Sequence, residues 1–104
     1  MTIIIEFNDT VAEGDLFSPT PVIGVFDFID HIINTLNGKI IIHIADISKK
    51  KAIEEWLIDH HRPLLVCISI KSVEVSDVIP KYSAYISSRA IRFTNFKDIE
   101  RYFI

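Results

Sequence analysis

Polar side chains that could take part in chemistry follow four apolar segments of this 104-residue chain. Glu6 and the tripeptide Asn8-Asp9-Thr10 come after the first segment, Asp46 after the second, Lys71 after the third and Ser87-Ser88 after the fourth. If these segments are parallel strands, their carboxyl ends share one edge of a sheet, which is where ligands bind in such folds. A carboxylate and an ammonium group at that edge would pair with each other or hold an anion.

The order of the segments predicts an α/β domain with an open parallel sheet and flanking helices. Continuous apolar, β-branched runs are typical of strands buried on both faces. They predict strands over residues 2–7, 39–44, 64–70, 82–86 and 90–93. Apolar residues at helical spacing predict helices over residues 21–36, 48–61 and 96–103, the first two capped by Thr20 and Ser48. Because strands and helices alternate, we expect three layers, with helices on both faces of the sheet.

Length and composition point to one folded domain over residues 1–104. Eleven Lys and Arg residues against fourteen Asp and Glu residues give a net charge of −3, which argues against binding to nucleic-acid phosphates. The 49% of hydrophobic residues excludes a disordered chain. So small and apolar a chain also has surface that a second copy, in a homodimer, or another protein could cover.

The cysteine content and the length of the apolar runs indicate the cellular compartment in which the protein is expected. A lone cysteine, Cys67, permits no internal disulfide, and its apolar neighbours predict a buried, inert thiol. No apolar window approaches the length that crosses a bilayer, and the N-terminal run is too short for a signal sequence. We therefore expect a cytoplasmic protein that does not contact membranes.

Residues 3–11, Ile-Ile-Ile-Glu-Phe-Asn-Asp-Thr-Val, resemble the opening motif of the haloacid dehalogenase (HAD) superfamily, an apolar strand followed by Asp-x-Asp-x-Thr. Residues 84–93 resemble the last motif of its small members, where a strand ends in Asp-Asp before Arg-Ala-Ile-Arg-Phe. Between them, residues 40–46 look like the second-strand motif, and Lys71 stands where the family keeps a phosphate-binding lysine. The segment after Thr10 has room for a small flap but not for a cap domain.

The resemblance implies a phosphohydrolase scaffold whose reactive groups have been replaced. In the family, the first Asp takes the phosphoryl group, the second is a general acid, a Ser or Thr binds phosphoryl oxygens, and the last acids help to hold Mg²⁺. The corresponding positions here are, in that order, Glu6, Asn8, Ile44 and the pair Ser87 and Ser88.

Each replacement weakens a different part of phosphoryl transfer. Glu6 keeps a carboxylate, but its extra methylene displaces the nucleophile by roughly 1 Å, enough to cost about 10²-fold in rate. Asn8 has no proton to give, and Ile44 cannot donate a hydrogen bond. Serines are poor ligands for Mg²⁺, which prefers carboxylates, phosphates and water. We therefore expect vestigial catalytic positions at Glu6 and Asn8, with no metal and no cofactor.

The residues at the family's motif positions, whether they match the family or replace its residues, make up the predicted ligand-binding set: Glu6, Asn8, Asp9, Thr10, Ile44, Lys71, Ser87 and Ser88. The resulting hypothesis is a catalytically degenerate HAD-like domain that acts by binding a protein partner or a phosphorylated ligand. One alternative is a weak Mg²⁺-dependent phosphohydrolase in which Glu6 replaces the nucleophilic Asp. Another is a structural subunit without a ligand.

Overall fold

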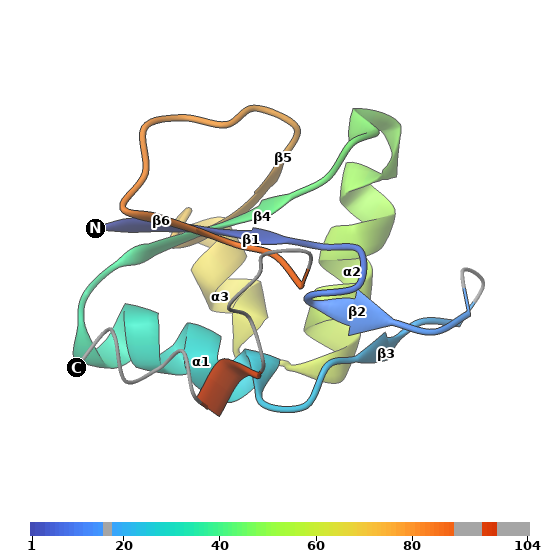
Figure 1. Ribbon diagram of the computed structural model, residues 1–104, viewed down its shortest axis with the longest axis horizontal. Coiled ribbons are helices and arrows are strands. Elements are labelled where there is room, and N and C mark those ends of the chain that lie inside the picture. The colour runs from blue at the N-terminus through green and yellow to red at the C-terminus, as the bar shows by residue number, and fades with distance from the viewer. Residues whose placement is uncertain (16–17, 89–94, 98–104) are drawn as a thin grey trace.

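A four-stranded parallel sheet forms the centre of the computed structural model, which describes residues 1–15, 18–88 and 95–97 (Figure 1). Its strands are β1 (Thr2–Glu6), β4 (Lys39–His43), β5 (Val73–Ser76) and β6 (Ala84–Ile86). They lie in the order β5-β4-β1-β6, and all pairs are parallel. The predicted α/β class with a parallel sheet is thus confirmed.

The two central strands are nearly identical in pattern, because each has three isoleucines between polar ends. Ile3, Ile4 and Ile5 of β1 are fully buried, and residues 40–42 of β4 are buried beside them. The pairing runs in register from Thr2 opposite Lys39 to Glu6 opposite His43. Isoleucine suits this position because its branched side chain is stiff and packs well on a pleated surface. The first two predicted strands are confirmed.

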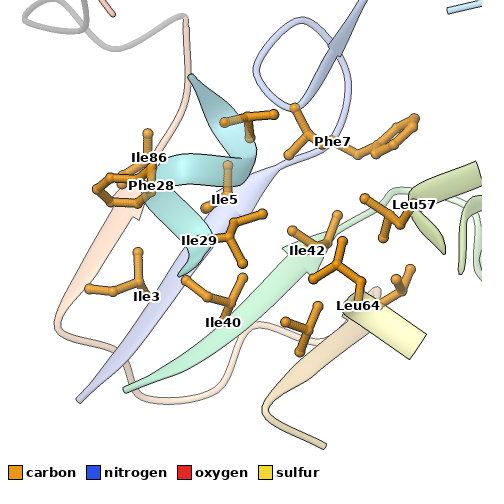
Figure 2. Packing of buried hydrophobic residues seen from close by; sticks show 14 of the residues in the cluster. Ile3, Ile5, Phe7, Phe28, Ile29, Ile40, Ile42, Leu57, Leu64 and Ile86 are labelled. Carbon is orange, nitrogen blue, oxygen red and sulfur yellow. The ribbon is translucent and has the colours of Figure 1, made fainter. Parts of the chain in front are cut away.

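The helices α1 (Val25–Asp30), α2 (Lys50–His60) and α3 (Leu64–Ser69) pack on one face of this sheet. Figure 2 shows isoleucines of β1 and β4 pointing toward the α1 residues Phe28 and Ile29 and toward Leu64 of α3. All of these side chains belong to one buried cluster, to which α2 contributes Leu57. A single core therefore holds the three helices to the sheet.

The opposite face of the sheet carries Ile4 and Ile41, which are buried but lie outside that cluster. Residues 77–83, the crossover loop, join β5 on one edge to β6 on the other and arch over this face in Figure 1. Seven extended residues reach about 23–25 Å, enough to cross three strand spacings of about 4.8 Å. Because this crossover has no helix, the described residues place helices on one face only, and the expected third layer is not among them.

The predicted third strand, over residues 64–70, is wrong, because this run forms α3 and the next strand is β5. A short apolar run can be a buried strand or a helix, and its periodicity does not separate them. Pro63, with a φ of −54°, starts the helical path, and Leu64 is buried while Leu65 and Val66 are exposed. The fourth predicted strand is confirmed as β6, whereas the fifth and most of the last helix lie outside the described residues.

The segment that follows β1 forms a small hairpin. In it β2 (Ala12–Glu13) pairs antiparallel with β3 (Thr20–Pro21). Thr20 is therefore a strand residue, not the predicted cap, and α1 begins only after Gly24, whose φ of 85° suits glycine. Beyond α1 the chain continues as a π-helical turn over His31–Thr35. The predicted helix over 21–36 is thus confirmed in its centre but starts four residues too early.

The predicted helix over residues 48–61 is confirmed as α2 with a preceding 3-10 turn at Ile47–Lys49, but its cap was assigned to the wrong residue. The Asp46 carboxylate accepts hydrogen bonds from the Ser48 backbone N–H at 3.0 Å and from the Ser48 hydroxyl at 2.7 Å. Asp46 has the extended backbone typical of a capping residue, so it, not Ser48, satisfies the free N–H group.

Two adjacent leucines of α3 test its orientation. Leu64→Ala removes a fully buried side chain and should lower the free energy of unfolding by about 2–5 kcal/mol. Leu65→Ala, on a side chain that is 47% exposed, should change it by about 0.5 kcal/mol or less. Urea denaturation measures both values. Equal losses would indicate a segment buried on both sides, as in the strand first expected here.

Candidate functional site

The carboxyl-terminal edge of the sheet brings together residues from the two ends of the chain. The Ser87 hydroxyl, just beyond β6, donates a hydrogen bond to Glu6 Oε2 at 2.6 Å. The Ser88 backbone N–H donates to Thr10 Oγ1 at 2.8 Å, and Thr10 is fully buried. Four residues of the predicted ligand-binding set therefore lie close together, joined by hydrogen bonds to one another.

The turn after β1 uses most of its backbone N–H groups internally. The N–H of Phe7 bonds the carbonyl of His43, and that of Asp9 bonds Ala12. The amides of Val11 and Ala12 both bond back to Phe7. Asp9 takes a left-handed φ of 63°, which Asp and Asn tolerate better than other side chains. The amides of Phe7, Asp9, Val11 and Ala12 are therefore already bonded to carbonyl groups of the protein.

Lys71 lies at the opposite edge of the sheet from Glu6. It sits between α3 and β5, and the carbonyl of the next residue, Ser72, accepts a hydrogen bond from Ile40 near the start of β4. Glu6 instead ends β1, opposite the last residue of β4. The expectation that Lys71 follows a strand and faces Glu6 is wrong, because the apolar run before it is a helix.

Two further polar residues adjoin Glu6, on the face of the sheet crossed by the loop of residues 77–83. His43 is the register partner of Glu6, and its Nδ1 lies 3.2 Å from the Tyr85 hydroxyl. Their rings meet edge to face at 6.0 Å. Neither His43 nor Tyr85 belongs to the predicted ligand-binding set. Alternation along the strands could have found them, because Glu6, His43, Tyr85 and Ser87 all point to one face.

A groove of about 650 Å³ opens beside this edge, between the β2–β3 hairpin and the first half of α2. Its apolar lining includes Phe7, Ile44, Ile53 and Trp56. Among the described residues, its charged lining consists of Asp9, Glu13, Asp15, Asp46 and Lys49. Of the predicted ligand-binding set it contains Asn8, Asp9 and Ile44, whereas Glu6 and Ser87 do not line it. We call it the acidic groove.

Aromatic packing holds the apolar side of the acidic groove in place. The Trp56 indole N–H donates to the Pro19 carbonyl at 3.1 Å, which ties α2 to the hairpin. Phe7 meets the same indole edge to face at 5.3 Å. Both rings are therefore set by contacts within the chain, so the shape of the groove does not depend on a ligand.

Among residues 1–15, 18–88 and 95–97, no group of three His, Cys, Asp or Glu side chains could hold a metal ion. No helix within those residues combines the length and apolar character needed to cross a membrane. Comparison with protein-family models, curated proteins and solved structures finds no match to this chain.

The hydrogen bonds that the Asp46 carboxylate accepts from Ser48 should affect its titration. Hydrogen bonds from the Ser48 hydroxyl and backbone hold the pKa of Asp46 below its ordinary value. The stabilisation is thus present at neutral pH and is lost as the pH falls through that lowered pKa. Ser48→Ala removes the hydroxyl and should raise the Asp46 pKa, measured by carboxyl-carbon NMR. An unchanged titration would show that the hydroxyl does not bond Asp46 in solution.

The hydrogen bond from Ser87 to Glu6 can be tested by comparing variants of two serines. Ser87→Ala leaves Glu6 Oε2 without this donor and should lower the free energy of unfolding by about 1–2 kcal/mol. Ser83→Ala, at an exposed position before β6, is the matched control and should have little effect. Chemical denaturation of both variants gives the comparison, and equal stabilities would contradict the contact.

Proposed function

We propose that this chain is a catalytically degenerate HAD-like domain that acts by binding a protein partner and not by phosphoryl transfer. The observation that carries the proposal is the hydrogen bond from Ser87 to Glu6 at 2.6 Å. It joins the position of the family's nucleophile to a position of its metal-binding acids. Support for the HAD-like part comes from the central place of β1 in the sheet and from the meeting of the first and last motifs at one edge.

The arrangement of this edge favours stability over catalysis. A carboxylate that accepts a short hydrogen bond is a weaker nucleophile, because the bond stabilises the charge that an attack must use. The position of the general acid, Asn8, is exposed and has no proton to give. Ile44, at the position that would bind phosphoryl oxygens, is buried in the hydrophobic core.

The same geometry favours a protein over a phosphorylated ligand. Lys71, the cation expected to bind phosphate, lies at the far edge of the sheet. Within the part of the chain that the structure describes, four carboxylates and one lysine line the groove near the edge. A phosphate there would face excess negative charge, whereas burial of apolar lining against a partner would be favourable.

Turnover of an aryl phosphate with Mg²⁺ tests the loss of catalysis. The unaltered chain should release no more phosphate than its Glu6→Ala variant. Release by the unaltered chain that Glu6→Ala abolishes would overturn the proposal.

The effect of inorganic phosphate on the melting temperature distinguishes a phosphorylated ligand from a protein partner. A phosphate site would raise the melting temperature in proportion to the logarithm of phosphate concentration. We expect phosphate and sulfate at equal ionic strength to give the same melting temperature. A specific rise with phosphate would favour the phosphorylated ligand over the protein partner.

A further inference from the structure

We infer that the acidic groove is the partner-binding surface, and that it takes a cationic peptide segment in which Lys or Arg side chains flank an apolar one. This inference rests on the proposed function and adds the place and the chemistry of the partner. Three observations carry it: the shape of the groove, the nature of its lining, and the distribution of charge over the described residues.

The shape and lining fit a short peptide segment. A volume of about 650 Å³ lies within the range of about 300–1,000 Å³ typical of ligand sites. Phe7 and Ile44 are nearly buried, and Ile53 and Trp56 are half-buried, so the lining has an apolar part that water solvates poorly. An apolar side chain of a partner would cover this part and contact two aromatic rings that are already held in place.

Much of the excess negative charge of the described residues lies in this groove. Residues 1–15, 18–88 and 95–97 include 8 Lys and Arg residues and 12 Asp and Glu residues. The groove is lined by one of the former and four of the latter, which leaves 7 and 8 elsewhere among the described residues. Three of their four excess negative charges therefore face a single concave surface. Such a field attracts cationic groups and repels phosphates.

The carboxylates of the groove come from three segments of the chain. Asp9 lies in the tight turn after β1, and Glu13 and Asp15 flank Gly14, whose φ of 92° turns the hairpin strand. Asp46 precedes the 3-10 turn before α2, where the two Ser48 hydrogen bonds fix its carboxylate. Cationic side chains next to a central apolar residue could thus meet carboxylates from different segments, in a groove that Trp56 also lines.

Trp56 provides the readout, because it is the only tryptophan in the chain. The probe is a short peptide in which one leucine lies between pairs of arginines, and which has no aromatic residue. We expect a saturable change in Trp56 fluorescence on titration. A peptide with citrulline in place of every arginine keeps the shape and removes the charge, so it should give no saturable change.

Two variants with the same change of net charge separate the groove from the rest of the surface. The groove variant carries Asp9→Asn, Glu13→Gln and Asp15→Asn, and asparagine keeps the left-handed turn at position 9. The control variant carries Glu55→Gln, Asp59→Asn and Asp77→Asn, all at exposed positions outside the groove lining. We expect the groove variant to bind about tenfold more weakly and the control to change less than about twofold.

The inference is overturned by any of three results: no saturable change with the arginine peptide, equal binding of the citrulline peptide, or equal weakening in the two variants. Its failure can be told from failure of the proposed function, because phosphate release by the unaltered chain is measured independently. If the peptide does not bind and the chain releases no phosphate, a non-catalytic domain remains, and its partner binds another surface or has another chemistry.

Discussion

The pairing of β1 with β4 is the interaction on which the rest of the structure depends. Each strand places three isoleucines between polar ends, and the five-residue register joins them over their whole length. Every other described strand of the main sheet pairs with one of these two. The helices pack on the isoleucines that project from one face. Parallel strands buried on both faces need such continuous apolar sequence, since neither face meets water.

The alternation of side chains along these strands divides the carboxyl edge into two sites. Glu6, His43 and Ser87 project to the face that the crossover loop of residues 77–83 spans, where they form hydrogen bonds with neighbouring residues. Phe7 and Ile44, each one residue further along, project to the helical face and line the acidic groove. Successive side chains of a strand point to opposite faces. Neighbours in sequence, such as Glu6 and Phe7, therefore belong to different sites, one to the hydrogen-bonded edge and the other to the acidic groove.

This division separates positions that a phosphohydrolase would need in one place. The carboxylate at position 6 and the residue at position 44 follow neighbouring strands, yet they face opposite sides of the sheet. The acidic side chains of the groove come from the turn, the hairpin and the start of α2, none of which is a strand end of the last motif. Binding through the groove and stability of the hydrogen-bonded edge thus involve different residues.

The sequence by itself determined the class of fold, the two central strands and α2, because long β-branched runs and helical spacing are local signals. It also predicted that the groups after these strands share one edge of the sheet, which holds for Glu6 and Ser87. Only the tertiary structure decided that residues 64–70 form a helix and that Lys71 lies at the far edge. It also decided that four carboxylates from three segments of the chain line the same groove as Trp56. A short apolar run is compatible with either secondary structure, and packing against Leu57, Ile42 and their neighbours selects one of them.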